Sequence, residues 1–164
     1  MRYYHPVTPA ETNPTLAALC SQLAPGSQPL YVDVRPLLDV PANDCFPLVE
    51  DRVRRHGGTR VLGWSLWEMP TLFVEAEFHA VWRSPEGEYV DIAPKAQPTA
   101  RILFLPLADA IYHNRQVNNV RRTIGNDPEV ERYLRGFDDL FEFMNRGERA
   151  ERHGEIELSG TEVH

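Results

Sequence analysis

The sequence predicts an α+β domain in which N-terminal helices pack on an antiparallel sheet of about four to five strands, with further helices at the C-terminal end. Three observations support this prediction. Apolar and polar residues alternate over 72–82, as in a strand with one buried face. Residues 13–23 and 127–144 instead carry apolar residues at helical spacing behind a capping residue and a proline. A chain of 164 residues is long enough for one domain with its own core.

The first predicted helix follows Asn13, whose side chain can cap the first turn, and Pro14 suits the first helical position. Its apolar residues share one face, and they are Leu16, Leu19, Cys20 and Leu23. Because Cys20 lies within this face, we expect it to be a buried structural residue. Residues 30–34 are rich in tyrosine and valine, which favour a strand.

A second helix is predicted from about Asp44 to His56, where the glycine pair at 57–58 ends it. The chain beyond it has the pattern of a β region. Strands are expected over residues 61–67, 72–82, 89–93 and 101–105. Residues 84–87 form the turn of a hairpin, and Gly63 is expected to mark a bulge or a close approach between strands.

The C-terminal third is predicted to be helical, over 107–120 and again from Pro128, with Asp127 as the N-cap. The apolar residues of the last helix share one face, and they are Val130, Tyr133, Leu134, Phe137, Leu140, Phe141 and Met144. This face is expected to pack in the core or to form a homodimer interface. Residues 146–164 are charged without an apolar pattern, so we expect a flexible tail after a single domain over 1–145.

Charge and cysteine content narrow the class of protein. The net charge of −7 argues against general nucleic-acid binding, for which a basic face is expected. No apolar stretch approaches the ~20 residues needed to span a bilayer, and residues 1–6 lack the apolar run of a signal peptide, so we expect a cytoplasmic protein without membrane contact. The two cysteines, Cys20 and Cys45, are too few for a disulfide framework.

Cys45 stands at the start of the second predicted helix. Unpaired backbone N–H groups and the positive end of the helix dipole favour a thiolate there. A thiolate is the nucleophilic form of cysteine, and the same N–H groups can donate to an oxyanion formed by its attack. The alternative interpretation is that Cys45 is a small buried residue at a helix start.

His79 and Asp91 lie on the two strands of the predicted hairpin, each in the polar phase of the alternation. The turn at 84–87 makes them direct or diagonal cross-strand neighbours, and a one-residue bulge could align them fully. A carboxylate beside an imidazole fixes its tautomer and raises its basicity. Alternatively, His79 is a solvent-facing histidine among carboxylates.

Other residues are candidates for binding a substrate or an oxyanion. Glu75 and Glu77 share the strand face of His79, where they can select a cationic or amine-bearing substrate or simply face solvent. Glu77 is also a rival partner for the imidazole. Asn43 and Gln28 are candidates for a second oxyanion donor. Three tryptophans can form either cleft walls or core, and they are Trp64, Trp67 and Trp82.

A cysteine at a helix start, then a histidine on one strand and an aspartate on the next, resembles the papain-like superfamily in its compact bacterial forms, the transglutaminase-like and NlpC-like cysteine enzymes. The segment 79–94 is similar to the transglutaminase-core pattern of a His strand, a turn and an Asp strand that ends near a proline. The runs 63–67 and 75–82 also resemble a family of small bacterial proteins. The resemblance extends over residues 43–94.

This resemblance implies a papain-like fold with Cys45, His79 and Asp91 as catalytic residues. The implied activity is that of a thiol hydrolase or acyl transferase that acts through a thioester on a peptide, amide or amine-bearing substrate, without a cofactor. Two alternatives stay open. One is a zinc or iron site built from the same three residues with Glu75 and Glu77, although no close pair of ligands occurs in the sequence. The other is a non-catalytic binding module.

Overall fold

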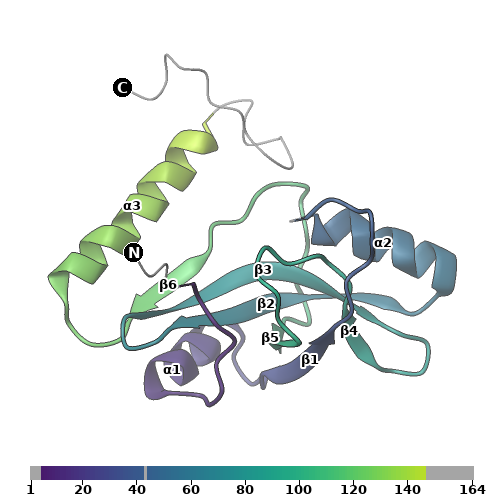
Figure 1. The fold of residues 1–164 in the computed structure, drawn as a ribbon, viewed down its shortest axis with the longest axis horizontal. Coiled ribbons are helices and arrows are strands. Elements are labelled where there is room, and N and C mark those ends of the chain that lie inside the picture. Colours follow the sequence, from purple (N-terminus) through teal and green to yellow (C-terminus); the bar gives the residue numbers. More distant parts are fainter. Residues whose placement is uncertain (1–4, 43, 147–164) are drawn as a thin grey trace.

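The computed structural model of the chain describes residues 5–42 and 44–146. Its elements, in chain order, are α1 (Pro14–Leu23), β1 (Leu30–Val34), α2 (Cys45–His56), β2 (Thr59–Met69), β3 (Phe73–Arg83), β4 (Tyr89–Asp91), β5 (Arg101–Pro106), β6 (Val120–Thr123) and α3 (Pro128–Met144). The protein is therefore an α+β fold, as the sequence predicts (Figure 1). The tail predicted over 146–164 lies outside the described residues apart from Arg146. None of the helices in the described ranges has the length and apolar character needed to cross a membrane.

The six strands form one sheet in the order β2-β5-β1-β4-β3-β6, and β2 also pairs with β3. Five strands therefore close into a ring, and β6 is added beside β3. The pairing of β1 with β4 is parallel, whereas the other pairings are antiparallel. The sheet therefore has one strand more than the four to five expected. One of its pairings is parallel, whereas an antiparallel sheet was expected. A parallel pair is possible here because the long connection through α2, β2 and β3 separates β1 from β4.

Two short strands share one edge of β3 and leave a gap between them. β6 pairs with residues 73–76 of β3, and β4 pairs with residues 82–83. Residues 77–81 lie between these two ladders. His79 lies within this gap, so the chain places its side chain where the wall of the ring is interrupted.

Strand alternation divides the core into an inner and two outer parts. Four fully buried residues form the cluster inside the ring, and they are Val32, Val81, Ile102 and Phe104. α1 packs on one outer part of the sheet and α2 on another. The expected close approach at Gly63 is confirmed, because a Cβ there would lie 2.2 Å from the Leu105 carbonyl oxygen.

The helix expected over 107–120 is absent, and most of this segment is irregular before β6 begins. Asn114 has a φ of 55°, in the left-handed region that an α-helix excludes. Asparagine side chains, which recur at 118 and 119, also compete with helical hydrogen bonds. Within the C-terminal part that the structure describes, up to residue 146, α3 is therefore the single helix in place of the helices expected.

α3 begins as predicted, with the Asp127 side chain accepting a hydrogen bond from Glu129 N–H. Its apolar face is mostly not part of the core. Leu134 is its one buried residue, whereas Tyr133 is 60% and Leu140 is 46% exposed. The expectation of a core role is thus wrong for much of this face, and the homodimer interface stays a prediction.

Candidate active site

Cys45 is the first residue of α2 and is buried. Asp44 occupies the N-cap position but its side chain forms no capping hydrogen bond. Pro47 has no N–H group, so the first turn offers the N–H groups of Cys45 and Phe46, which have no intrahelical acceptor. The positive end of the helix dipole adds to these donors. The start of α2 thus suits a negative charge at Cys45.

His79 and Asp91 meet across the β3–β4 hairpin. The register of Trp82 with Val90 extrapolates to Val81 opposite Asp91, which makes His79 and Asp91 diagonal neighbours on one face. His79 Nε2 lies 3.0 Å from Asp91 Oδ2, within hydrogen-bond distance. Diagonal placement is sufficient for this contact, so no bulge is needed. Both side chains are buried, which excludes the solvent-facing interpretation of His79.

The Asp91 carboxylate has three partners. Ala93 N–H donates to Oδ1 at 3.0 Å, and Lys95 Nζ lies 2.6 Å from Oδ2. The same Lys95 nitrogen is 3.2 Å from His79 Nε2. Lys95 was not identified from the sequence, because a lysine beyond the end of a strand carries no periodic signal. The Ala93 and Lys95 contacts fix the carboxylate, and the carboxylate in turn holds His79 Nε2 on the side of the ring that faces Asp91.

The electrostatics of this group favour an ion pair. Burial alone would lower the pKa of the His79 imidazole, but the negative charges of Cys45 and Asp91 outweigh it and raise the pKa to about 10. Burial would raise the pKa of Asp91, but His79 and then Lys95 lower it to about 2. His79 is therefore cationic and Asp91 anionic at neutral pH. Cys20, by contrast, has a pKa raised by burial in the apolar cluster beneath α1.

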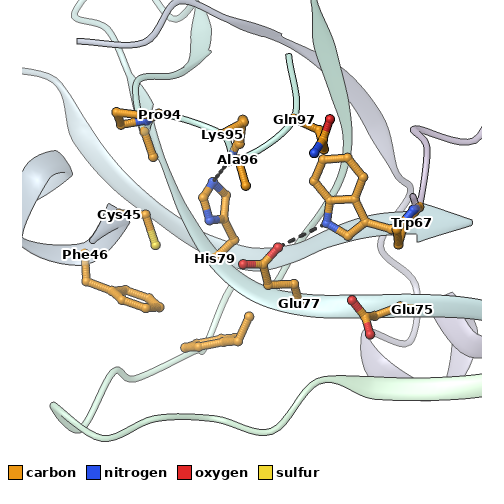
Figure 2. A pocket seen from close by; sticks show the side chains of 13 residues that line it. Cys45, Phe46, Trp67, Glu75, Glu77, His79, Pro94, Lys95, Ala96 and Gln97 are labelled. Carbon is orange, nitrogen blue, oxygen red and sulfur yellow. Dashed lines mark hydrogen bonds between the residues drawn. The ribbon is translucent and has the colours of Figure 1, made fainter. Parts of the chain in front are cut away.

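A cavity of about 240 Å³ opens beside Cys45 and His79. Figure 2 shows the Cys45 sulfur on the side of the His79 ring opposite Lys95, so the second ring nitrogen, Nδ1, is the one that faces the thiol. The other lining residues are Pro6, Phe46, Trp67, Glu75, Glu77, Phe78 and residues 93–97. The helix start, the gap in β3 and the chain after β4 thus meet at one cavity.

The remaining candidates divide between this cavity and other places. Glu75 and Glu77 both line it; Glu75 forms an ion pair with Arg121, and Glu77 accepts a hydrogen bond from Trp67 Nε1 at 3.1 Å. Glu77 is therefore not the partner of His79. Gln28 is exposed and does not line the cavity, and Asn43 lies outside the described residues.

Two tryptophans considered as cleft walls are instead core residues. Trp64 belongs to the cluster beneath α1, and Trp82 to the cluster beneath α2. Trp82 donates from Nε1 to the Gly57 carbonyl, which ties the end of α2 to β3. Both lie on the strand face opposite to that of His79 and Trp67, which explains why only Trp67 reaches the cavity.

A second, larger cavity of about 810 Å³ adjoins the first. Phe46, Glu77 and Phe78 line both cavities. Phe46 stacks on Tyr112 with ring centroids 3.8 Å apart, so the segment expected as a helix instead supports the residue after Cys45. Neither this contact nor the role of Gln97 in the cavity wall has a signal in the sequence pattern.

Among the described residues, no three His, Cys, Asp or Glu side chains are grouped so that they could hold a metal ion. Both cysteines are free thiols. Comparison of the chain with protein-family models, curated proteins and solved structures gives no match.

Proposed function

We propose that this protein is a cysteine-nucleophile enzyme that hydrolyses an amide or transfers its acyl group, with Cys45, His79 and Asp91 as the catalytic triad. The observation that carries the proposal is the position of His79. Its Nε2 is 3.0 Å from Asp91, and the negative charge of Cys45 raises its pKa from the other side. This is the arrangement expected for a nucleophile, its base and the group that orients the base.

In the proposed reaction, the Cys45 thiolate forms a bond to the substrate carbonyl carbon, and the carbonyl electrons move to oxygen. The N–H groups of Cys45 and Phe46 at the start of α2 stabilise this oxyanion. Collapse of the intermediate breaks the C–N bond, and His79 Nδ1 donates its proton to the leaving amine. A thioester remains on Cys45.

Water or a second amine then attacks the thioester while His79 accepts a proton from it. The acyl group leaves as an acid or a new amide, and the thiolate and imidazolium re-form. Asp91 remains ionised throughout and holds the imidazole through Nε2. Kinship with papain-like enzymes is part of the proposal, and it is supported by the order of helix start, His strand and Asp strand.

The test compares the alkylation of Cys45 with that of Cys20. At pH 6.5 a thiol with the usual pKa of about 8.5 is mostly protonated and reacts slowly with iodoacetamide. We expect Cys45 to react at least ~10 times faster than Cys20 in the folded protein, and His79→Ala to remove this difference. Digestion and mass spectrometry assign the label to each cysteine.

A second experiment measures the turnover of fluorogenic amide and ester substrates by the same protein, with Cys45→Ala as the control. Labelling in urea at the same pH shows the rate at which both thiols react when exposed. Equal, slow labelling of Cys45 and Cys20 in the folded protein would overturn the proposed function.

A further inference from the structure

The charges around the cavity beside Cys45 do not cancel. The charges of four side chains sum to zero when the thiol and the imidazole form an ion pair, and these are Cys45, His79, Asp91 and Lys95. Glu75 is neutralised by its ion pair with Arg121. The charged cavity residue left over is Glu77, which forms no ion pair within the described ranges. One carboxylate in the wall therefore has no ion-pair partner among the described residues.

Glu77 is held so that it faces the cavity. One carboxylate oxygen, Oε2, accepts the hydrogen bond from Trp67 Nε1 at 3.1 Å. Figure 2 shows the other oxygen directed away from Trp67, toward the side on which Cys45 and Phe46 lie. A Trp N–H donor is neutral, so it orients the carboxylate but leaves its charge in place.

The strand fixes the separation between this carboxylate and the reacting groups. Glu77 is two residues before His79 on β3, so both side chains share a face about 7 Å apart. The cavity volume of about 240 Å³ is below the roughly 300–1,000 Å³ of sites for drug-sized ligands. A single side chain or a small amine fits such a space better than a larger ligand.

We propose that Glu77 binds a positively charged group of the substrate, an ammonium or a guanidinium, on a side chain next to the carbonyl that Cys45 attacks. The substrate class is then amides of basic residues or of small amines with a second cationic group. The aromatic walls from Trp67, Phe46 and Phe78 complement a cation with a hydrocarbon stem. This inference rests on the proposed function, because it assigns the substrate of the same site.

The test uses two dipeptidyl chloromethyl ketones that differ only in their last side chain, lysine in one and the neutral norleucine in the other. In each reaction the Cys45 sulfur bonds to the methylene carbon and chloride leaves. The second-order rate constants for Cys45 are measured by mass spectrometry, with Cys20 as the internal reference. We expect the lysine reagent to react at least ~10 times faster with Cys45, since a charge-assisted contact forms only with that reagent.

Variants and salt provide the controls. Glu77→Gln is expected to lower the rate of the lysine reagent at least ~10-fold more than that of the norleucine reagent. Glu86→Gln, on the exposed hairpin turn outside the cavity, is the matched variant and should keep the preference. Added salt should weaken the preference of the unmodified protein, which tests the inference even if Glu77→Gln does not fold.

The labelling rates distinguish a failure of the cation site from a failure of the proposed function. If Cys45 reacts faster than Cys20 but with equal rates for both reagents, the cation site is overturned and the proposed function stands. If neither reagent labels Cys45 faster than Cys20, the proposed function is overturned, and this inference with it.

Discussion

His79 Nε2 and Asp91 Oδ2 are 3.0 Å apart, and the two side chains are 3% and 0% exposed. A buried charge costs several kcal/mol unless it is paired and hydrogen-bonded. Asp91 meets this condition through His79, Lys95 and the Ala93 N–H. The pair is therefore part of the folded structure as well as of the candidate site, and its removal affects both.

Replacing Asp91 should destabilise the protein strongly. Asp91→Ala leaves the His79 and Lys95 cations close together without their shared partner, and breaking a buried ion pair in this way costs about 3–5 kcal/mol. Asp33→Ala is the matched control, because Asp33 is 66% exposed and pairs with Arg35 at the surface. Exposed pairs contribute about 0–1 kcal/mol. Urea unfolding of both variants measures the difference, and equal losses would contradict the role of Asp91.

The stability should also depend on pH in a defined way. The pKa of Asp91 is lowered from 3.8 to about 2, so its contribution of about 2 kcal/mol is present above pH ~4 and is lost as the pH falls toward 2. The pKa of His79 is raised from 6.5 to about 10, so its contribution is complete below pH ~6.5 and is lost as the pH rises through about 10. These two groups together predict maximal stability between pH ~4 and ~6.5.

Urea unfolding of the reduced protein across pH 2 to 10 checks this profile. The difference between the unmodified protein and Asp91→Asn isolates the acid limb, because the variant cannot titrate at this position. If the difference in free energy of unfolding between the two proteins stays constant from pH 5 to 2, Asp91 has the same pKa in the folded and unfolded states.

Local patterns in the sequence predicted most of the elements and the hairpin of the site. The alternation over 72–82 predicted β3, and capping residues predicted the starts of α1 and α3. The polar phase of the two hairpin strands was sufficient to predict that His79 and Asp91 are neighbours. These features depend on residues close in the chain, so the sequence alone contains their signal.

Long-range features had no such signal. The parallel pairing of β1 with β4 and the closure of the ring depend on which strands meet in space. The contact of Lys95 with Asp91 depends on how the chain turns after β4. Asn114 has a left-handed conformation that a helix over 107–120 would exclude, and Tyr112 in this irregular segment stacks on Phe46.

Two glycines should respond oppositely to replacement by alanine. At Gly63 the added Cβ would lie 2.2 Å from the Leu105 carbonyl oxygen and 2.7 Å from the Phe104 ring, so the β2–β5 ladder must separate. We expect Gly63→Ala to lower the free energy of unfolding by about 2 kcal/mol or more. At Gly136, within α3, the added Cβ would meet no described atom within 4 Å other than those of its chain neighbours and the helix backbone, and alanine favours a helix by about 1 kcal/mol.

Thermal and urea unfolding of the two variants measure these changes. Gly136→Ala should raise the stability and serves as the control for the substitution itself. Tolerance of Gly63→Ala without loss of stability would contradict the close approach of β2 and β5.

The pKa of His79 should depend on the thiol of Cys45. Apart from burial, the negative charge of Cys45 is the largest influence on that pKa, and it acts to raise it. Cys45→Ser leaves a neutral hydroxyl, which cannot supply the negative charge that raises this pKa, so we expect the midpoint of the His79 titration to fall by at least about one pH unit. NMR titration of the His79 Cε1–H signal measures this change. Cys20→Ser is the control, since Cys20 lies in the separate cluster beneath α1 and should leave the midpoint unchanged. If Cys45→Ser also leaves it unchanged, the two side chains do not form the ion pair from which the proposed attack by the thiolate begins.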